Sequence, residues 1–226
     1  MLQENCFGKS ELSFLIDVIS THHTFFFREG AHFEFLRNTA LPELAARAKK
    51  EHWPRLRAWS AACSSGEEPY TLAIVMAECL QSHGLSWHID ATDVSEGILE
   101  KARNGIYKAD ALEQVSPDRR KTFFQCGIGP QSGNFRVKTN LRSNVTFQQL
   151  NLLSRPLPFS EPFPIIFCRN VMIYFDRPTH EELLQNLTGS LIPGGYLLVG
   201  HSESLTGIKH NLEMVAPATY RRPLDS

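Results

Sequence analysis

Residues 56–74 read LRAWSAACSSGEEPYTLAI and pass from an apolar strand pattern, through a run of small residues, into a helical pattern. Pro69 suits the first turn of a helix, because the N–H group that proline lacks would have no partner there. Glu67 and Glu68 place negative charge at the positive end of the helix dipole. A strand, a tight loop and a helix in this order predict the first crossover of an open α/β sheet, whose ligands bind beyond the carboxyl ends of the strands.

The composition of this loop restricts the ligand. The loop contains neither GxGxxG nor GxxxxGK(S/T), so the residues that hold phosphates are missing, which argues against a nicotinamide dehydrogenase. Glu67 and Glu68 would repel a pyrophosphate but would suit the ammonium group and the ribose diol of S-adenosylmethionine. Alternatively, both glutamates only cap the helix. We expect one of them to cap it and the other to contact a ligand.

Length and composition indicate an ordinary globular protein. At 226 residues the chain is long enough for one α/β domain with small additions, and its net charge of −1 gives no general attraction to nucleic acid. The cysteines are scattered and form no CxxC pair, which predicts a reducing compartment without zinc or disulfides: Cys6, Cys63, Cys79, Cys126 and Cys168. We find no signal peptide and no apolar run of about 20 residues. We therefore expect a soluble cytoplasmic monomer that does not insert into membranes.

An aromatic segment, residues 21–29 with the sequence THHTFFFRE, precedes this unit. If the segment forms a helical turn, Thr24 and Arg28 share a face because they are four residues apart. Arg28 would then either bind the carboxylate of an amino-acid-like ligand or pair with Glu29 on the surface. His22 and the histidine after it could suggest a metal site. No further ligand has a suitable spacing, so we expect solvated or capping histidines.

Helical and strand patterns continue on both sides of this segment. The apolar spacing predicts one short helix within residues 1–21 and two more within residues 31–55. Residues 87–94 predict a second strand that ends in Asp93, where nucleoside-binding α/β folds hold ribose hydroxyls. Alternatively, the position only supplies the N-cap of the helix that follows, at residues 95–107, and either Asp93 or Ser95 could be that cap.

Residues 108–150 interrupt the α/β pattern, and the second part of this stretch, from about residue 123, differs most from it. Glycines and the alternating segments FRVKT and VTFQQL predict a small antiparallel β-subdomain there. The main sheet then resumes with an apolar strand over residues 163–168 and ends in a hairpin over residues 212–222. Polar residues follow these later strands at the carboxyl edge of the sheet, where the site is expected: Asn151, Arg169, Asn170 and Tyr174.

Seven motifs occur in order between about Glu11 and Arg222: TFFFRE, SAACSSGEEPY, ATDVSEGILEKARNGIY, NLL, IFCRNVMIYFD, LIPGGYLLVGHSE and YRR. Each motif alone is weak, but the set resembles the CheR-type protein-glutamate O-methyltransferases of bacterial chemotaxis. The resemblance implies a Rossmann-like fold, with S-adenosylmethionine as the methyl donor and S-adenosylhomocysteine as the product. It also implies that the chain methylates glutamate side chains of chemoreceptors.

The resemblance also implies roles for individual residues. The implied cofactor-binding residues, with no metal ligand among them, are His22, Thr24, Arg28, Glu68, Asp93, Asn151, Leu152, Arg169 and Asn170. Glu68 would take the amino group of the donor and Asp93 the ribose, and the last four residues of that list would line the nucleoside side. Thr24 and Arg28 would meet the methionine part. Tyr174 would lie near the methyl group, so Arg28 and Tyr174 are the candidate catalytic residues. His22 stands where the family commonly has asparagine.

The domain organisation follows from the same resemblance. We expect an N-terminal helical segment, residues 1–55, and a methyltransferase domain, residues 56–226, with the β-subdomain at about 123–150. Family members usually carry a helical receptor-docking domain before the TFFR segment, and here only its last helix is expected. Some members grip a peptide tether at a chemoreceptor's C-terminus with the β-subdomain. The expected partner is the cytoplasmic region of a chemoreceptor. Two alternatives stay open: a methyltransferase for another protein or a small molecule, and a non-catalytic sensor or scaffold that binds S-adenosylmethionine.

Overall fold

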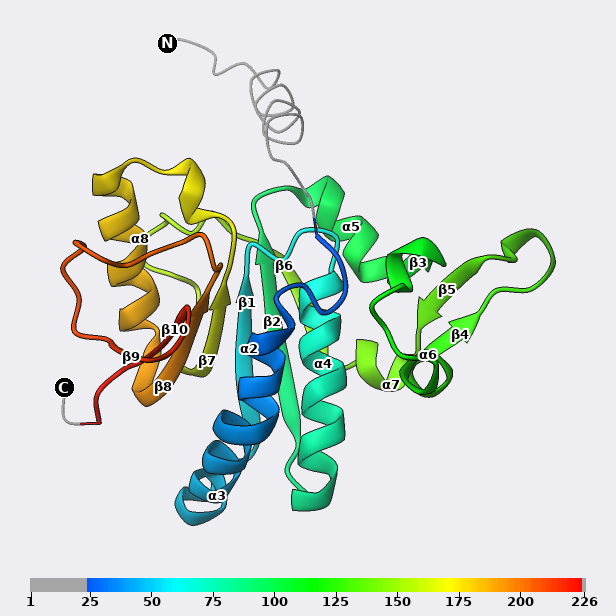
Figure 1. The fold of residues 1–226 in the computed structure, drawn as a ribbon, viewed down its shortest axis with the longest axis horizontal. Helices are drawn as coiled ribbons and strands as arrows, with labels where there is room; N and C mark the ends of the chain where they lie inside the picture. Colours follow the sequence, from blue (N-terminus) through cyan, green and yellow to red (C-terminus); the bar gives the residue numbers. More distant parts are fainter. Residues whose placement is uncertain (1–23, 225–226) are drawn as a thin grey trace, which may run out of the picture.

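The computed structural model describes residues 24–224, so the helix expected within residues 1–21 and the position of His22 lie outside the described residues. Within residues 24–224, seven strands form the main sheet, in the spatial order β6 (Val145–Gln149), β2 (Trp87–Asp93), β1 (Leu56–Ala61), β7 (Phe163–Cys168), β8 (Leu191–Val199), β10 (Thr219–Arg221) and β9 (Glu213–Ala216). The first five run parallel, whereas β10 runs antiparallel to β8 and to β9 (Figure 1). The predicted Rossmann-like α/β fold is confirmed.

The order of the strands places the site. In the central strand β1, Ala58 pairs in register with Ile89 of β2 on one side and with Ile165 of β7 on the other. The chain thus builds the sheet outward from β1 in two opposite directions, and the strand order reverses between β1 and β7. In open α/β sheets a ligand crevice forms outside the carboxyl ends of the strands at this point.

The two faces of the sheet carry separate hydrophobic clusters because strand side chains alternate. Ala58 and Ile165 belong to the cluster that includes helices α3 (Leu41–Glu51) and α4 (Glu67–Leu80). Trp59 and Ile166, one residue further along the same strands, belong to the cluster that includes α8 (Arg177–Gly189). The sheet is therefore the middle layer of three, and β1 and β7 contribute to both cores, as the apolar sequence of β7 predicts.

The segment before β1 differs from the prediction of two separate helices. Helix α2 (Gly30–Phe35), a π-helical turn η1 (Leu36–Ala40) and α3 follow one another without a break. Pro42 lies in the first turn of α3 and has no backbone N–H, so it cannot donate a hydrogen bond to the turn before it. The π-helical turn, with its different hydrogen-bond spacing, lies immediately before this proline.

The small antiparallel sheet is confirmed, but one strand assignment was wrong. Its strands lie in the order β3 (Ile106–Lys108), β5 (Asn134–Val137) and β4 (Phe124–Cys126). The segment VTFQQL, expected in this sheet, forms β6 and pairs parallel with β2, with Val145 opposite Ile89. Alternation of apolar and polar residues shows that a segment is a half-buried strand, but it does not identify the pairing partner.

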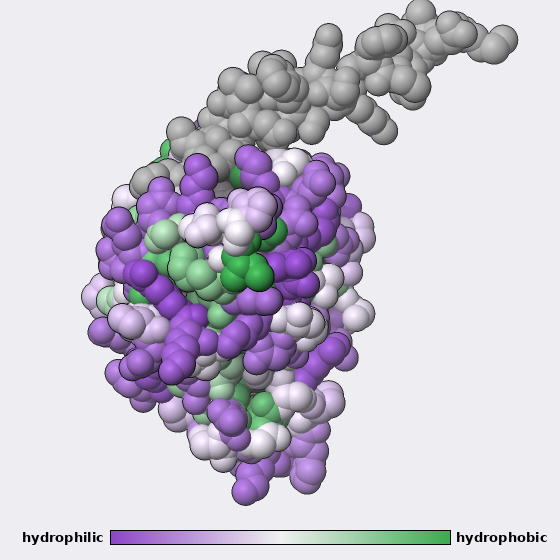
Figure 2. All heavy atoms as spheres, turned by 90° about the vertical axis from the view of Figure 1, so that its right-hand side faces the viewer, coloured by the Kyte–Doolittle hydropathy of each residue, from purple (hydrophilic) through white to green (hydrophobic). Residues whose placement is uncertain are grey.

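The remaining helices connect these strands. They are α5 (Glu96–Asn104), α6 (Pro117–Phe123), α7 (Thr139–Arg142) and the short turns η2 (Gln81–His83), η3 (Asp110–Leu112), η4 (Gly129–Gln131) and η5 (Met172–Tyr174). Polar side chains cover most of the face from which the small sheet projects, with only limited hydrophobic patches (Figure 2). Ile128, which joins β4 to η4, is 86% exposed. Within residues 24–224, no helix has the length and apolar character needed to cross a membrane.

Phe26 anchors the aromatic segment to the body of the fold. Its ring is fully buried and makes edge-to-face contacts with Tyr107 and Phe124, at centroid distances of 4.9 and 5.4 Å. Tyr107 and Phe124 come from the small sheet, and Phe26 therefore joins three parts of the chain. Of the three phenylalanines in this segment, Phe26 is the most buried.

Replacing Phe26 with alanine removes this ring from a packed core. We expect Phe26→Ala to lower the free energy of unfolding by about 3–5 kcal/mol in urea denaturation. The matched control is Phe25→Ala, because Phe25 is partly exposed. This substitution should lower the free energy of unfolding by about 1 kcal/mol or less. Equal losses in the two variants would contradict the anchoring role.

Candidate active site

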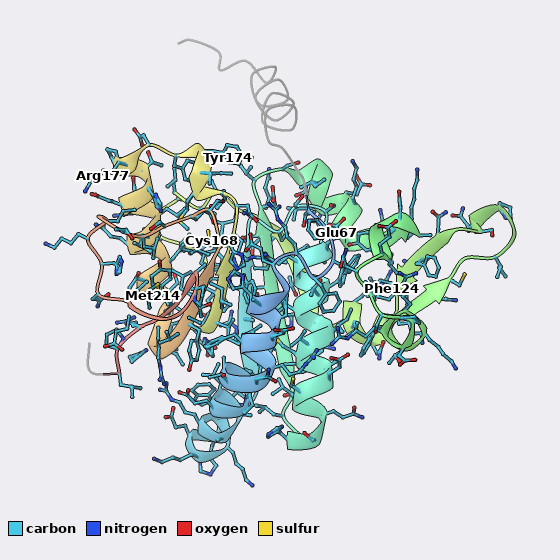
Figure 3. The ribbon with its side chains drawn as sticks, in the orientation of Figure 1. Glu67, Phe124, Cys168, Tyr174, Arg177 and Met214 are labelled. Atoms are coloured by element: carbon cyan, nitrogen blue, oxygen red, sulfur yellow. The ribbon has the colours of Figure 1, made fainter. Side chains whose placement is uncertain are left out.

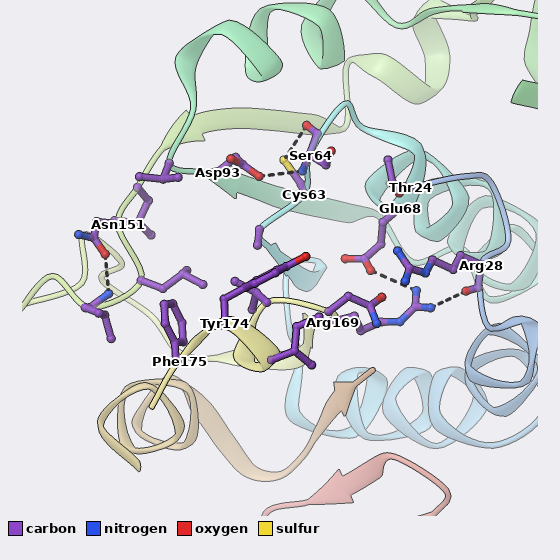
Figure 4. A pocket seen from close by; sticks show the side chains of 18 of the residues that line it. Thr24, Arg28, Cys63, Ser64, Glu68, Asp93, Asn151, Arg169, Tyr174 and Phe175 are labelled. Carbon is purple, nitrogen blue, oxygen red and sulfur yellow. Dashed lines mark hydrogen bonds and ion pairs between the residues drawn. The ribbon is translucent and has the colours of Figure 1, made fainter. Parts of the chain in front are cut away.

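A pocket of about 380 Å³ lies beyond the carboxyl ends of β1, β2 and β7. All predicted site residues that the structure describes line it: Thr24, Arg28, Glu68, Asp93, Asn151, Leu152, Arg169, Asn170 and Tyr174. His22 lies outside the described residues. Figure 3 shows Tyr174 and Glu67 toward the same end of the sheet, and Figure 4 shows the pocket residues from close by. The structure therefore brings together residues from five separate segments, whereas their individual roles stay predictions.

The aromatic segment reaches the pocket through a tight turn. The helical turn expected from the spacing of Thr24 and Arg28 is wrong, because Phe27 and Glu29 both have left-handed backbone conformations, with φ values of 58° and 56°. The chain folds back so that the N–H of Arg28 donates to the carbonyl of Phe25 at 3.3 Å. Thr24 and Arg28 still face one pocket, but the turn rather than a helix brings them there.

Arg169 connects this turn to the central helix. Its buried guanidinium donates to Oε2 of Glu68 at 3.1 Å, through Nε to Oε2 of Glu29 at 3.2 Å, and to the backbone carbonyl of Arg28 at 2.6 Å. Glu29 thus pairs with Arg169. Burial raises the pKa of Glu29, but the charge and hydrogen bonds of Arg169 outweigh burial and hold that pKa below its usual value.

Glu68 and Glu67 have different surroundings. Glu68 accepts a hydrogen bond from Oγ of Ser60 at 2.7 Å as well as the ion pair with Arg169. Burial raises the pKa of Glu68, and both partners oppose that rise. Glu67 accepts a hydrogen bond from Oγ of Ser65 at 2.6 Å, and burial raises its pKa too. Of the two, Glu68 lines the pocket, whereas Glu67 binds Ser65 in the loop before the helix; contact of Glu68 with a ligand stays a prediction.

Asp93 holds two loops together at the end of β2. Its carboxylate accepts the N–H of Ser64 at 2.8 Å and the N–H of Ser95 at 3.1 Å. The N-cap of α5 is Ser95, whose Oγ accepts the N–H of Ile98 at 3.1 Å. The capping alternative therefore belongs to Ser95, and Asp93 keeps its place in the pocket wall while it fixes the loop after β1.

The pocket has a charged end and an apolar end. Glu68, Arg28 and Arg169 lie together at one end, and Asn151 and Phe175 lie at the other (Figure 4). The apolar end also has leucine side chains in its wall, at positions 150, 152 and 153. This division suits a ligand with a charged amino-acid part and a flat nucleoside part, as S-adenosylmethionine has.

A buried glutamate that sequence reasoning missed fixes the loop that carries Tyr174. Glu203 accepts the backbone N–H groups of Asn170, Met172 and Gly200, each at 2.6–2.7 Å. These contacts join the loop after β7 to the loop after β8 and hold Asn170 in a left-handed conformation, with φ of 59°. Tyr174 follows on η5 with 58% of its surface exposed. Glu203 lies within the motif LIPGGYLLVGHSE, but the pattern does not show that it binds backbone.

Cys63 is a pocket residue whose reactivity is suppressed. Burial, together with the nearby charges of Asp93 and Glu68, raises the pKa of its thiol well above the ordinary value. A thiol that stays protonated is a poor nucleophile. The side chain therefore contributes shape to the wall, and the arrangement gives no support to covalent catalysis through Cys63.

Comparison with known proteins finds a family and relatives that are similar to this chain in sequence. Residues 22–221 match the family described as CheR methyltransferase, SAM binding domain. The chain is 43% identical over 221 residues to the chemotaxis protein methyltransferase of Borreliella burgdorferi, covering 97% of this chain and 77% of that protein. It is 39% identical over 220 residues to the chemotaxis protein methyltransferase of Salmonella typhimurium, covering 97% and 73% of the two. The solved structure of DszA carbon methyltransferase aligns with a TM-score of 0.46 at 18% identity, covering 75% of this chain and 35% of that one.

The sequence similarities define an S-adenosylmethionine-dependent methyltransferase. The chain belongs to the CheR methyltransferase family, and S-adenosylmethionine is its cofactor.

The role of Glu203 is open to a direct test. In Glu203→Gln the amide keeps one acceptor oxygen but turns an NH₂ group toward backbone N–H donors, so buried donors lose their partner. We expect the free energy of unfolding to fall by about 2–4 kcal/mol in chemical denaturation. Glu181→Gln, which removes an exposed pair with Arg177, should change it by about 0.5 kcal/mol or less. If both variants are equally stable, Glu203 does not hold the two loops.

Proposed function

We propose that the chain transfers the methyl group of S-adenosylmethionine to glutamate side chains of chemoreceptor proteins, forming glutamate methyl esters. The proposal rests on membership of the CheR methyltransferase family and on relatives that are named chemotaxis protein methyltransferases. The observation that carries it is the two-ended pocket, which places Glu68, Arg28 and Arg169 opposite the end where Asn151 and Phe175 lie.

Within this proposal the donor lies along the pocket. Glu68 receives its ammonium group and Asp93 its ribose hydroxyls. Thr24 and Arg28 contact the methionine part, and His22, which lies outside the described residues, stays a predicted cofactor-binding residue. The residues at positions 151, 152 and 170 line the nucleoside side. Arg169, the other residue that the resemblance assigns to the nucleoside side, is bound on three sides by protein groups, and we assign it mainly to positioning Glu68 and the turn that carries Arg28.

The reaction places few demands on the protein. A glutamate carboxylate is ionised at neutral pH and is itself the nucleophile, so no side chain has to remove a proton. Bound S-adenosylmethionine supplies an electrophilic methyl group on a sulfonium. Transfer breaks the carbon–sulfur bond and forms a carbon–oxygen bond, which neutralises both the sulfonium and the carboxylate. Arg28 and Tyr174 orient the substrate carboxylate in line with the breaking bond, and catalysis comes from that proximity.

The partner is proposed to be the cytoplasmic region of a chemoreceptor, which places the reaction in the cytoplasm. In the small sheet, β3 and β4 are the edge strands, and an edge can accept an extended peptide as a further strand. We propose that a receptor C-terminal tether uses this surface. The division into residues 1–55, a methyltransferase domain from residue 56 onward and a β-subdomain stays part of the proposal.

Labelled methyl transfer tests the proposed function directly. Receptor cytoplasmic fragments are incubated with the protein and methyl-labelled S-adenosylmethionine, and the product is treated with base. We expect label in the receptor that is released as methanol, because carboxyl esters hydrolyse in base whereas N-methyl groups do not. Base-stable label would point to another methyl acceptor. An absence of transfer while S-adenosylhomocysteine still binds would favour the sensor or scaffold alternative.

Arg28 provides a sharper test of the site. We expect Arg28→Lys to retain folding but to lose most of kcat/KM, because an ammonium cannot reproduce the planar two-pronged contact of a guanidinium with a carboxylate. Arg37→Lys is the matched control, since Arg37 pairs with Glu78 on the outer surface. We expect this variant to have normal turnover. Near-normal turnover of the Arg28→Lys variant would show that this segment has only a structural role.

A further inference from the structure

A second cluster of polar side chains lies behind the wall of the donor pocket. Glu29, His32 and His201 place one ligand atom each within 4.8 Å of one another. Glu29 immediately precedes α2, His32 lies in α2, and His201 lies in the loop after β8. None of the three lines the pocket itself, and Arg169 separates them from Glu68. The cluster is therefore a distinct feature of the fold.

His32 is an unusual residue for this position. Its side chain is 1% exposed, and neither ring nitrogen makes a hydrogen bond within normal distance and angle limits, although the Pro217 backbone and the Glu29 carboxylate lie close enough to raise its pKa against the effect of burial. Burial lowers the pKa of His32 to about 4, the charge of Arg169 adds to that effect, and Glu29 opposes it. Buried polar groups without partners are rare in folded proteins, and an unpaired one points to a water or an ion.

We propose that Glu29, His32 and His201 bind a divalent transition-metal ion of the zinc type. Two histidine nitrogens and one carboxylate oxygen form a common set of protein ligands for zinc and for iron(II), with further positions open to water. Ligands about 2.1 Å from a tetrahedral metal lie roughly 3.4 Å from one another. Nδ1 of His32 and Oε2 of Glu29 are 3.5 Å apart, which already matches that separation.

The third ligand gives the ion access. His201 is exposed, and its ring packs edge-on against His32 with the centroids 4.8 Å apart. A small rotation of an exposed side chain brings its nitrogen closer, whereas the buried His32 has little freedom to move. The ion can therefore enter from solvent on the His201 side and meet a fixed inner ligand.

Arg169 affects both the affinity of the cluster for the ion and the effect that binding has on the donor pocket. Its positive charge weakens cation binding, but its hydrogen bonds to Oε2 of Glu29 also orient that carboxylate, as outer-shell donors commonly do for metal ligands. The same guanidinium holds Glu68 in the donor pocket. Occupancy of the cluster is thus linked through one side chain to the charged end of the pocket.

Direct binding of Zn²⁺ to the tag-free full chain tests the proposal. In equilibrium dialysis we expect one equivalent of Zn²⁺ that His201→Ala weakens by at least about tenfold. Cobalt(II) added in place of zinc should give the intense visible absorption of a low-coordinate site, and that absorption should be lost in the same variant. His201→Ala should fold normally because the side chain is exposed, which a thermal melt checks.

Two control variants separate this site from adventitious binding. His83→Ala removes another exposed histidine, and the double substitution His22→Ala, His23→Ala removes the adjacent pair near the N-terminus. Both should keep the full equivalent of bound zinc. Absence of binding in the wild-type chain, binding that survives in His201→Ala, or binding that disappears in either control would overturn the proposal. None of these readouts depends on methyl transfer, so failure here leaves the proposed function untouched.

Discussion

The buried guanidinium of Arg169 is the contact on which the arrangement of the pocket depends. It binds Glu68 at the start of α4, Glu29 in the turn before α2 and the backbone carbonyl of Arg28, so one side chain joins three segments that are far apart in the sequence. Removing two carboxylates and a guanidinium from water is costly, and the mutual attraction offsets that cost only when every partner is in place. The charged end of the pocket is therefore already organised before a ligand binds.

The same principle recurs at the other loops around the pocket. Asp93 accepts two backbone N–H groups from the loops that follow β1 and β2, and Glu203 accepts three from the loops that follow β7 and β8. Loops at the end of a sheet have few regular backbone partners, and buried carboxylates supply them. The switch in strand order determines where the crevice forms, and these acidic residues determine its shape.

Much of this could be predicted from local patterns. The strand, small-residue loop and helix at residues 56–74 predicted both the sheet and the position of the pocket, and polar residues after strands predicted several of its lining residues. Local patterns failed where long-range partners decide the outcome. The alternating residues of β6 did not show that it pairs with β2, and the spacing of Thr24 and Arg28 did not reveal two left-handed residues. His32 and His201 meet only in the folded chain, so no spacing rule could find them.

The central claim is that Arg169 holds Glu68 in position for the ammonium group of the donor, and calorimetry with two ligands tests it most directly. S-adenosylhomocysteine carries the amino-acid part, whereas 5′-methylthioadenosine lacks it and keeps the nucleoside. Glu68→Gln should weaken the binding of S-adenosylhomocysteine by about 10- to 100-fold, the equivalent of one charged hydrogen bond. The affinity for 5′-methylthioadenosine should stay unchanged. Equal weakening of both ligands, or no change in either, would contradict the claim.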